Sequence, residues 1–153
     1  MRNINKLLIE QLDRKLFPFK EADQIKMPAQ GWINGIRTTL NMTMAQLGKK
    51  LGVTRQAVNR IEASEATGSI TLHLLKEVGS ALEMKLVYGF VPVCGSVDTL
   101  VDQKATELAR KIVLRTDHTM MLENQSTDRE HIDQAVCELA DEIKYEMRRS
   151  LWD

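Results

Sequence analysis

Cysteine, proline and aromatic residues are scarce in this sequence. It has 2 Cys, 3 Pro and 5% aromatic residues in 153 positions, whereas Met occurs 8 times. Cys94 and Cys137 lie far apart, and the three histidines do not join them at metal-ligand spacing. We therefore expect two idle thiols in a reducing cytoplasm, no metal site and no cofactor. The apolar residues that remain suit a helical core of Leu, Ile, Val and Met.

Long apolar runs are missing as well. No stretch approaches the roughly 20 residues that cross a bilayer. The N-terminal segment MRNINKLLIEQLDRK alternates charged with apolar residues and lacks the apolar core of a signal peptide. Neither a glycine-rich phosphate loop nor a grouping of nucleophile, base and orienting residue is present. These absences predict a cytoplasmic protein that is not an enzyme and does not enter a membrane.

The net charge of zero conceals an uneven distribution along the chain. Residues 26–92 carry eight Lys and Arg against four Glu, whereas residues 93–153 carry eight Lys and Arg against thirteen Asp and Glu. The middle of the chain is therefore the part that could meet a polyanion. We divide the chain into an N-terminal helix and linker (1–27), a central domain (28–92) and an acidic helical region (93–153).

Apolar periodicity predicts helices over most of the chain. Residues 4–17 place Ile4, Leu8, Leu12 and Leu16 four apart, which is one stripe of an amphipathic helix. Pro18 ends that helix, and residues 18–28 are predicted to be a linker. In the acidic region, two further amphipathic helices are expected, the first from Val97 and the second around residues 132–147.

Four helices are expected between Gly31 and Glu83. Thr43 caps the second of them and forms a capping box with Gln46. Thr54 and Thr71 cap the third and fourth. Residues 63–69 (ASEATGS), between these two helices, are rich in small and polar residues and are predicted to be a loop.

Residues 85–91 (KLVYGFV) are the only convincing strand pattern in the chain. A lone strand needs a partner for its backbone groups, so we expect it to pair with the same strand of a second copy across a two-fold axis. The alternative is pairing with residues 69–71. The predicted fold is therefore all-α with one short strand and with helical extensions at both ends.

Residues 44–63 (MAQLGKKLGVTRQAVNRIEA) have the pattern of a helix-turn-helix. Gly48 is small enough to lie where two helices cross, and Gly52 tolerates the positive φ of the turn. Five apolar residues fall where the motif must face the rest of its domain: Leu47, Leu51, Val53, Val58 and Ile61. The alternative is a helical hairpin with a solvated polar face.

The remaining face of the second helix carries side chains suited to DNA. Arg55 can donate two hydrogen bonds to a guanine, and Gln56 and Asn59 can pair with adenine edges. Thr54 and Arg60 can bind the flanking phosphates. The other predicted DNA-binding residues are Arg37, Thr43, Lys49 and Lys50, among which the three basic residues add sequence-independent, salt-sensitive attraction.

Residues 31–86 resemble the lambda-repressor/Cro-type, or XRE, helix-turn-helix family. The resemblance implies a regulator that reads the major groove of double-stranded DNA. Met44 stands where many members of that family have a glutamine that touches a phosphate, and the segment 63–69 is longer than the usual turn.

The chain from LLIEQLDRKL through GWINGIRTTL to the terminal LWD also resembles the family called mobile mystery protein A. That resemblance implies a partner with a Fic domain, which transfers AMP from ATP to hydroxyl groups. Thr119, Glu123 and Asn124 fit the Ser/Thr-x-x-x-Glu-Gly/Asn pattern of Fic inhibitory helices. In those helices the glutamate pairs with an arginine that would otherwise hold the ATP γ-phosphate.

Two functions follow as expectations. The first is a homodimeric repressor, acting on its own operon and serving as an antitoxin-like partner of a Fic toxin. The second is a pure inhibitor of a Fic protein, in which the helix-turn-helix is only a scaffold. Replacing Arg55 and Gln56 separates them, because only a repressor depends on these side chains.

Overall fold

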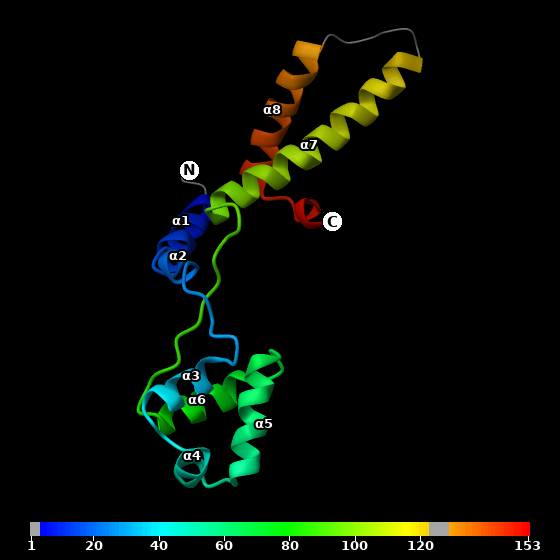
Figure 1. The fold of residues 1–153 in the computed structure, drawn as a ribbon. Helices are drawn as coiled ribbons and strands as arrows, with labels where there is room; N and C mark the ends of the chain where they lie inside the picture. Colours follow the sequence, from blue (N-terminus) through cyan, green and yellow to red (C-terminus); the bar gives the residue numbers. More distant parts are fainter. Residues whose placement is uncertain (1–3, 123–128) are drawn as a thin grey trace. The chain divides into compact units, whose positions relative to one another are not determined.

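The computed structural model describes residues 4–122 and 129–153, without the side chains of residues 117 and 119–122. The chain divides into two compact units (Figure 1). Residues 23–89 form one unit, and residues 1–22 together with 90–153 form the other. The N-terminal helix and the acidic C-terminal region, which are distant in sequence, thus belong to the same unit.

The unit of residues 23–89 contains four helices. They are α3 (Trp32–Thr39), α4 (Met44–Leu51), α5 (Arg55–Ala66) and α6 (Leu72–Ala81). Three of the predicted caps are confirmed, since the hydroxyls of Thr43, Thr54 and Thr71 accept hydrogen bonds from backbone N–H groups in the first turns of α4, α5 and α6. The beginnings of α4, α5 and α6 are therefore fixed by local sequence.

Leu47 and Val58 form the centre of this unit's core, and both are fully buried. Ile33, Val78 and Leu82 surround them, so that each of the four helices contributes to one cluster. Leu51 and Ile61 pack against it, whereas Val53, also predicted to face inward, is 39% exposed. The apolar pattern of the sequence thus placed four of its five positions correctly.

The other unit is built around a pair of long helices. These are α7 (Val97–Leu122) and α8 (Arg129–Glu146), accompanied by α1 (Ile4–Leu16), α2 (Phe19–Ala22) and a terminal 3-10 helix (Arg149–Trp152). Ala105 and Ala109 of α7 and Ala140 of α8 lie in their shared core, where small side chains allow a close approach. Val136, Ile143 and Leu151 fill the remainder.

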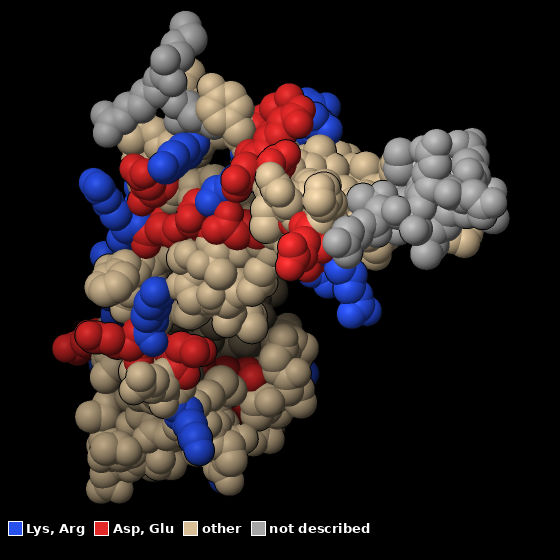
Figure 2. Space-filling view, turned by 90° about the horizontal axis from the view of Figure 1, so that it is seen from above, with Lys and Arg blue, Asp and Glu red and all other residues tan. Residues whose placement is uncertain are grey.

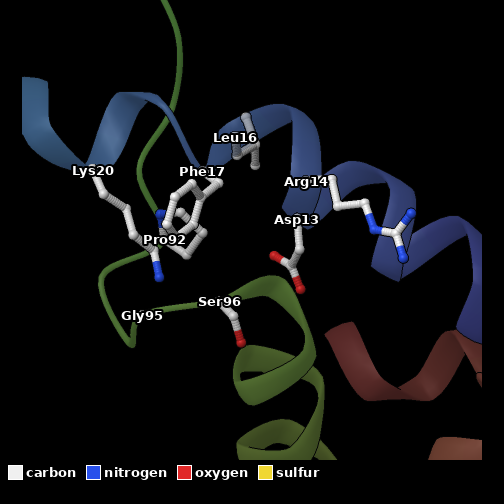
Figure 3. Close-up of a pocket in the computed structure, with 8 residues that line it drawn as sticks. All are labelled: Asp13, Arg14, Leu16, Phe17, Lys20, Pro92, Gly95 and Ser96. Carbon is white, nitrogen blue, oxygen red and sulfur yellow. The ribbon is translucent and has the colours of Figure 1, made fainter.

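A carboxylate attaches α1 to the start of α7. Asp13 accepts hydrogen bonds from the backbone N–H groups of Val97 (2.7 Å) and Asp98 (3.2 Å), and Figure 3 shows its side chain directed at the first turn of α7. Such N–H groups have no partner within their own helix, so a carboxylate from elsewhere in the chain suits them. Of the apolar side chains on α1, Ile9 is buried, whereas Ile4, Leu8 and Leu12 of the predicted stripe are exposed.

Charged side chains of opposite sign lie next to one another on the surface (Figure 2). Lys144 of α8 binds Asp98 at 3.0 Å and Asp102 at 2.6 Å on α7. Partial burial alone would lower the pKa of Lys144, but the two carboxylates outweigh it and raise the pKa above its ordinary value. Among the helices that the structure describes, none combines the length and apolar character that crossing a bilayer requires.

The predicted strand at residues 85–91 is wrong, since no residue among 4–122 and 129–153 lies in a β-strand. The N–H of Met84 instead bonds the carbonyl of Gly79 at 2.8 Å and closes the end of α6. Residues 69–71, the alternative pairing partner, are also engaged elsewhere. The N–H groups of Ser69 and Ile70 both donate to the carbonyl of Ser64. High β-propensity without a partner strand thus leaves an irregular segment.

Two predicted irregular segments are partly helical. Residues 63–66 of the predicted loop form the last turn of α5, and Gly68 (φ +75°) lies in the turn that follows. Residues 19–22 of the predicted linker form α2. The composition of residues 63–69 was a poor guide because Glu65, which lies among them, is buried and bonds the start of α3. Pro18 ends α1 as predicted but does not prevent a short helix directly after it.

Candidate nucleic-acid interface

The turn between α4 and α5 has the geometry that the sequence predicted. Gly52 adopts φ +70° at the end of α4, a conformation that side chains disfavour. A Cβ atom on Gly48 would lie 2.7 Å from the carbonyl oxygen of Val53, so only glycine fits where α4 passes the turn. These two glycines set the path of the chain into α5.

The first turns of α5 present one polar, exposed face. The five residues predicted to contact DNA there are all exposed, whereas Val58, between them in sequence, is fully buried. They are Thr54, Arg55, Gln56, Asn59 and Arg60. Because Val58 anchors the opposite side of the helix, this polar face is turned to solvent. We call it the α5 face below.

Basic residues of α4 line a groove between this helix and the segment that precedes it. Lys49 and Lys50 are exposed and line this groove, about 610 Å³ in volume, together with Asn41 and Gln46. Thr43 is exposed, but its hydroxyl is engaged in the capping box with Gln46. Lys50 Nζ also lies 3.8 Å from a carboxylate oxygen of Glu83, which leaves Lys49 as the stronger candidate for a phosphate contact.

Arg37, predicted to contact DNA, has a different role. Its side chain is buried, and Nε and Nη2 bond the two carboxylate oxygens of Glu62 at 2.5 and 3.2 Å. Nη1 donates to the carbonyl of Met42 at 2.9 Å. A guanidinium engaged at three nitrogens inside the fold cannot reach a phosphate, so this residue stabilises the packing of α3 on α5 instead.

The environment of Glu62 keeps it ionised. Burial favours its neutral form, but hydrogen bonds from Arg37 and from Asn34 Nδ2 (2.8 Å) outweigh burial and lower the pKa of Glu62. The same hydrogen bond to Glu62 is the main cause that raises the pKa of Arg37. The pair is therefore charged at neutral pH, with its hydrogen-bonding groups engaged within the fold.

A second buried carboxylate of α5 holds the beginning of α3. Glu65 is 6% exposed and accepts hydrogen bonds from the N–H groups of Trp32 (3.0 Å) and Ile33 (2.8 Å). A Cβ atom on Gly31, which has φ +86°, would lie 2.6 Å from Glu65 Oε2. Sequence reasoning missed both carboxylates, although Glu62 and Glu65 follow the buried Val58 by four and seven residues and so share its side of the helix.

The predicted Fic-inhibitory residues fall at the edge of the described part of the chain. Thr119 belongs to α7, but its side chain lies outside the description, as do Glu123 and Asn124 altogether. The prediction that these three residues form a motif therefore remains a prediction.

Comparison with known proteins agrees with the geometry of the central unit. Residues 33–88 match the family model described as helix-turn-helix, which covers α3 through α6 and the segment that follows. No curated protein and no solved structure matches the chain. The matched region coincides with the unit that carries the α5 face. Residues 33–88 are thus a helix-turn-helix domain of the lambda-repressor/XRE type, the DNA-binding domain of a regulator.

Proposed function

We propose that this protein is a sequence-specific transcriptional repressor that binds an operator in its own promoter region and is not an enzyme. The observation that carries the proposal is the α5 face, an exposed polar surface on the second helix of a helix-turn-helix domain. Arg55, Gln56 and Asn59 are the residues we assign to base edges, because their side chains offer the paired donors and acceptors that guanine and adenine require.

The phosphates flanking the bases have their own candidate partners. Thr54 and Arg60 lie at the borders of the α5 face, and Lys49 is exposed on α4. Contacts of this kind fix the register of the helix in the groove and make the affinity fall as salt rises. In a homodimer on a near-palindromic operator, we expect the two α5 helices to lie about 34 Å apart, one turn of B-DNA.

A binding titration against the DNA upstream of the gene, at two salt concentrations, tests this function. Wild type should bind more tightly than to a random duplex. The Arg55→Ala/Gln56→Ala variant should lose roughly 1–3 kcal/mol per base contact and much of its sequence preference. Lys49→Ala is the matched control, since it should weaken binding to both duplexes alike. If wild type shows no preference over random DNA, the repressor proposal fails.

A Fic-domain protein as partner is the second candidate, and the pattern Thr119-x-x-x-Glu123-Asn124 supports it. On this proposal Glu123 binds an arginine of the Fic site bidentately and displaces a phosphate oxygen of ATP. The protein would then act as an antitoxin, with or without DNA binding. Wild type should inhibit AMP transfer by a Fic protein encoded beside this chain, and Glu123→Ala should not inhibit it. Equal inhibition by both would remove this candidate.

A further inference from the structure

An apolar cavity in the helix-turn-helix unit is lined by α3, α6 and the segment that follows α6. Its volume of about 380 Å³ is at the small end of the roughly 300–1,000 Å³ of pockets that hold small molecules. Trp32 and Ile36 of α3, Leu75 and Val78 of α6, and Val87 of the following segment are among its lining residues. None of the residues assigned to DNA lines it, so the proposed function leaves this cavity unexplained.

The walls of the cavity are fixed by the fold. Val78 and Leu82, which both line it, belong to the buried core of the unit. The segment after α6 is anchored where it leaves the helix, since the N–H of Met84 bonds the carbonyl of Gly79 at 2.8 Å after a left-handed turn at Glu83 (φ +58°). The cavity is therefore formed before any ligand arrives, which lowers the cost of binding one.

One carboxylate, that of Glu65, lies among the apolar lining residues. It is buried, and its two oxygens accept hydrogen bonds from the N–H groups of Trp32 (3.0 Å) and Ile33 (2.8 Å). Glu65 thus has partners already and does not need a cation from a ligand. Its negative charge would repel an anionic group placed beside it. The part of the cavity next to Glu65 therefore suits an uncharged, apolar group.

Two exposed lysines lie at or beside the mouth of the cavity. Lys85 is one of its lining residues. Lys76 of α6 has its Nζ 5.9 Å from the centre of the Tyr88 ring, on the segment that forms one wall. Within the part of the chain that the structure describes, neither lysine forms a salt bridge. Lys85 is therefore available to an anionic group that enters the cavity.

The acidic residues next to these lysines in sequence already have basic neighbours. A carboxylate oxygen of Glu83 lies 3.8 Å from Lys50 Nζ, and one of Glu77 lies 3.4 Å from His73 Nε2. The charge that remains uncompensated at the mouth is therefore positive. A positive mouth on an apolar cavity favours an anionic ligand over a neutral or cationic one.

We propose that this cavity binds a small amphipathic carboxylate. The apolar body of the ligand packs on Ile36, Leu75 and Val78, and its carboxylate binds Lys85 at the mouth. The cavity has the volume of about twelve water molecules, at about 30 Å³ each, which is enough for a chain of about eight carbon atoms. Burial of the chain supplies most of the affinity, while the contact with Lys85 selects an acid over a neutral molecule of the same length.

Titration of the full chain with sodium octanoate, followed by proton–nitrogen correlation spectra, tests the inference. The chain has 2 Trp, of which Trp32 lines the cavity and Trp152 belongs to the other unit. Octanoate at millimolar concentrations should shift the indole N–H signal of Trp32 in a saturable way and leave that of Trp152 in place. Octanol, which has the same chain without the charge, should bind at least about threefold more weakly.

Lys85→Gln should raise the dissociation constant for octanoate at least about threefold and leave that for octanol unchanged. Lys26→Gln is the matched control and should change neither, because Lys26 is an exposed lysine of the same unit that does not line the cavity. The proposal is overturned if octanoate leaves the Trp32 signal in place, shifts both indole signals alike, binds no better than octanol, or binds Lys85→Gln as well as wild type. A Trp32 signal that shifts when the protein alone is diluted would also overturn it, because a second copy would then cover the cavity. No DNA is present in this experiment, so failure of the repressor proposal would leave its result unaffected.

Discussion

The two ends of α5 have charged residues with opposite roles. In its first half, Arg55 and Arg60 are exposed, and neither belongs to the unit's hydrophobic core. Towards its other end, Glu62 and Glu65 are 5% and 6% exposed and bind α3 through Arg37 and through two backbone N–H groups. The charged residues at one end of the helix thus face solvent, whereas those at the other end hold α3.

This difference shows that the type of a charged residue does not reveal its role. Arg37 and Arg55 are both arginines in the more basic part of the chain, yet one is buried against a carboxylate and the other is free to meet a ligand. Burial and the geometry of the partner decide between the two roles. A buried ion pair whose members are both hydrogen-bonded is costly to break, whereas an exposed arginine is cheap to lose.

The largest effect is expected from separating the buried pair. Arg37→Ala leaves Glu62 charged and buried without its main partner, which should lower the free energy of unfolding by about 3–5 kcal/mol. Urea unfolding followed by circular dichroism measures this loss. Arg60→Ala is the matched control and should change stability by less than about 0.5 kcal/mol. If the two variants were equally stable, the division of α5 into two ends would be wrong.

Replacement of both members sharpens the same comparison. Arg37→Met/Glu62→Leu removes both charges and keeps apolar bulk, so it should recover much of the stability that Arg37→Ala loses. Binding to DNA should then recover together with folding, because neither residue belongs to the α5 face. A double variant that folds but no longer binds DNA would instead indicate that Arg37 contacts DNA.

The next largest effect is expected at Glu65. Glu65→Ala removes the acceptor for the N–H groups of Trp32 and Ile33, and we expect a loss of roughly 1.5–3 kcal/mol. Glu65→Gln keeps one acceptor oxygen and should lose less. Urea unfolding of the pair provides the measurement, and a Glu65→Ala variant as stable as wild type would exclude the proposed role of this carboxylate.

A smaller effect is expected at the cap that begins α5. The Thr54 hydroxyl accepts the N–H of Ala57 at 3.2 Å, and Thr54→Ala should cost about 1 kcal/mol of stability. Thr54→Ser keeps the hydroxyl and should be close to wild type. Thr54 also lies on the α5 face, so the alanine variant should lose DNA affinity at a temperature where it is fully folded. An alanine variant with unchanged stability would show that this cap does not support α5.

The smallest effect is expected in the pH dependence of stability, which tests whether Glu62 is ionised in the folded domain. The folded pKa of Glu62 is below its unfolded value, which is near 4.5. The contribution of ionised Glu62 to the free energy of unfolding is therefore complete above the unfolded pKa. It is lost as the pH falls through the lower, folded pKa. Between neutral pH and strongly acidic pH, wild type should lose more stability than Glu62→Gln does. Parallel curves would indicate that Glu62 is not held ionised by Arg37.

The features that the sequence predicted correctly are local ones. Thr43, Thr54 and Thr71 cap helices through atoms three residues away, and Gly52 turns the chain by its own φ, so neighbouring residues suffice to identify them. The exposure of the α5 face followed from the period of Val58 and its neighbours. None of these inferences required knowledge of a distant partner.

The errors concern contacts between residues far apart in the chain. Arg37 meets Glu62, 25 positions away, and Glu65 meets Trp32, 33 positions away. Residues 85–91 have the composition of a strand, but a strand exists only with a partner that the composition does not supply. The stripe on α1 had the period of a core helix, yet Ile9 rather than Ile4, Leu8 or Leu12 is the buried residue.

The selectivity of the α5 face tests the central claim most directly. The measurement is the dissociation constant for a random duplex divided by that for the upstream DNA, at one salt concentration, with wild type, Arg55→Ala and Arg110→Ala. Arg110 is an exposed arginine on α7 and serves as the matched control. We predict that Arg55→Ala reduces the ratio about 5- to 160-fold, equivalent to 1–3 kcal/mol, while Arg110→Ala leaves it unchanged. Equal ratios for all three proteins would contradict the assignment of the α5 face to DNA.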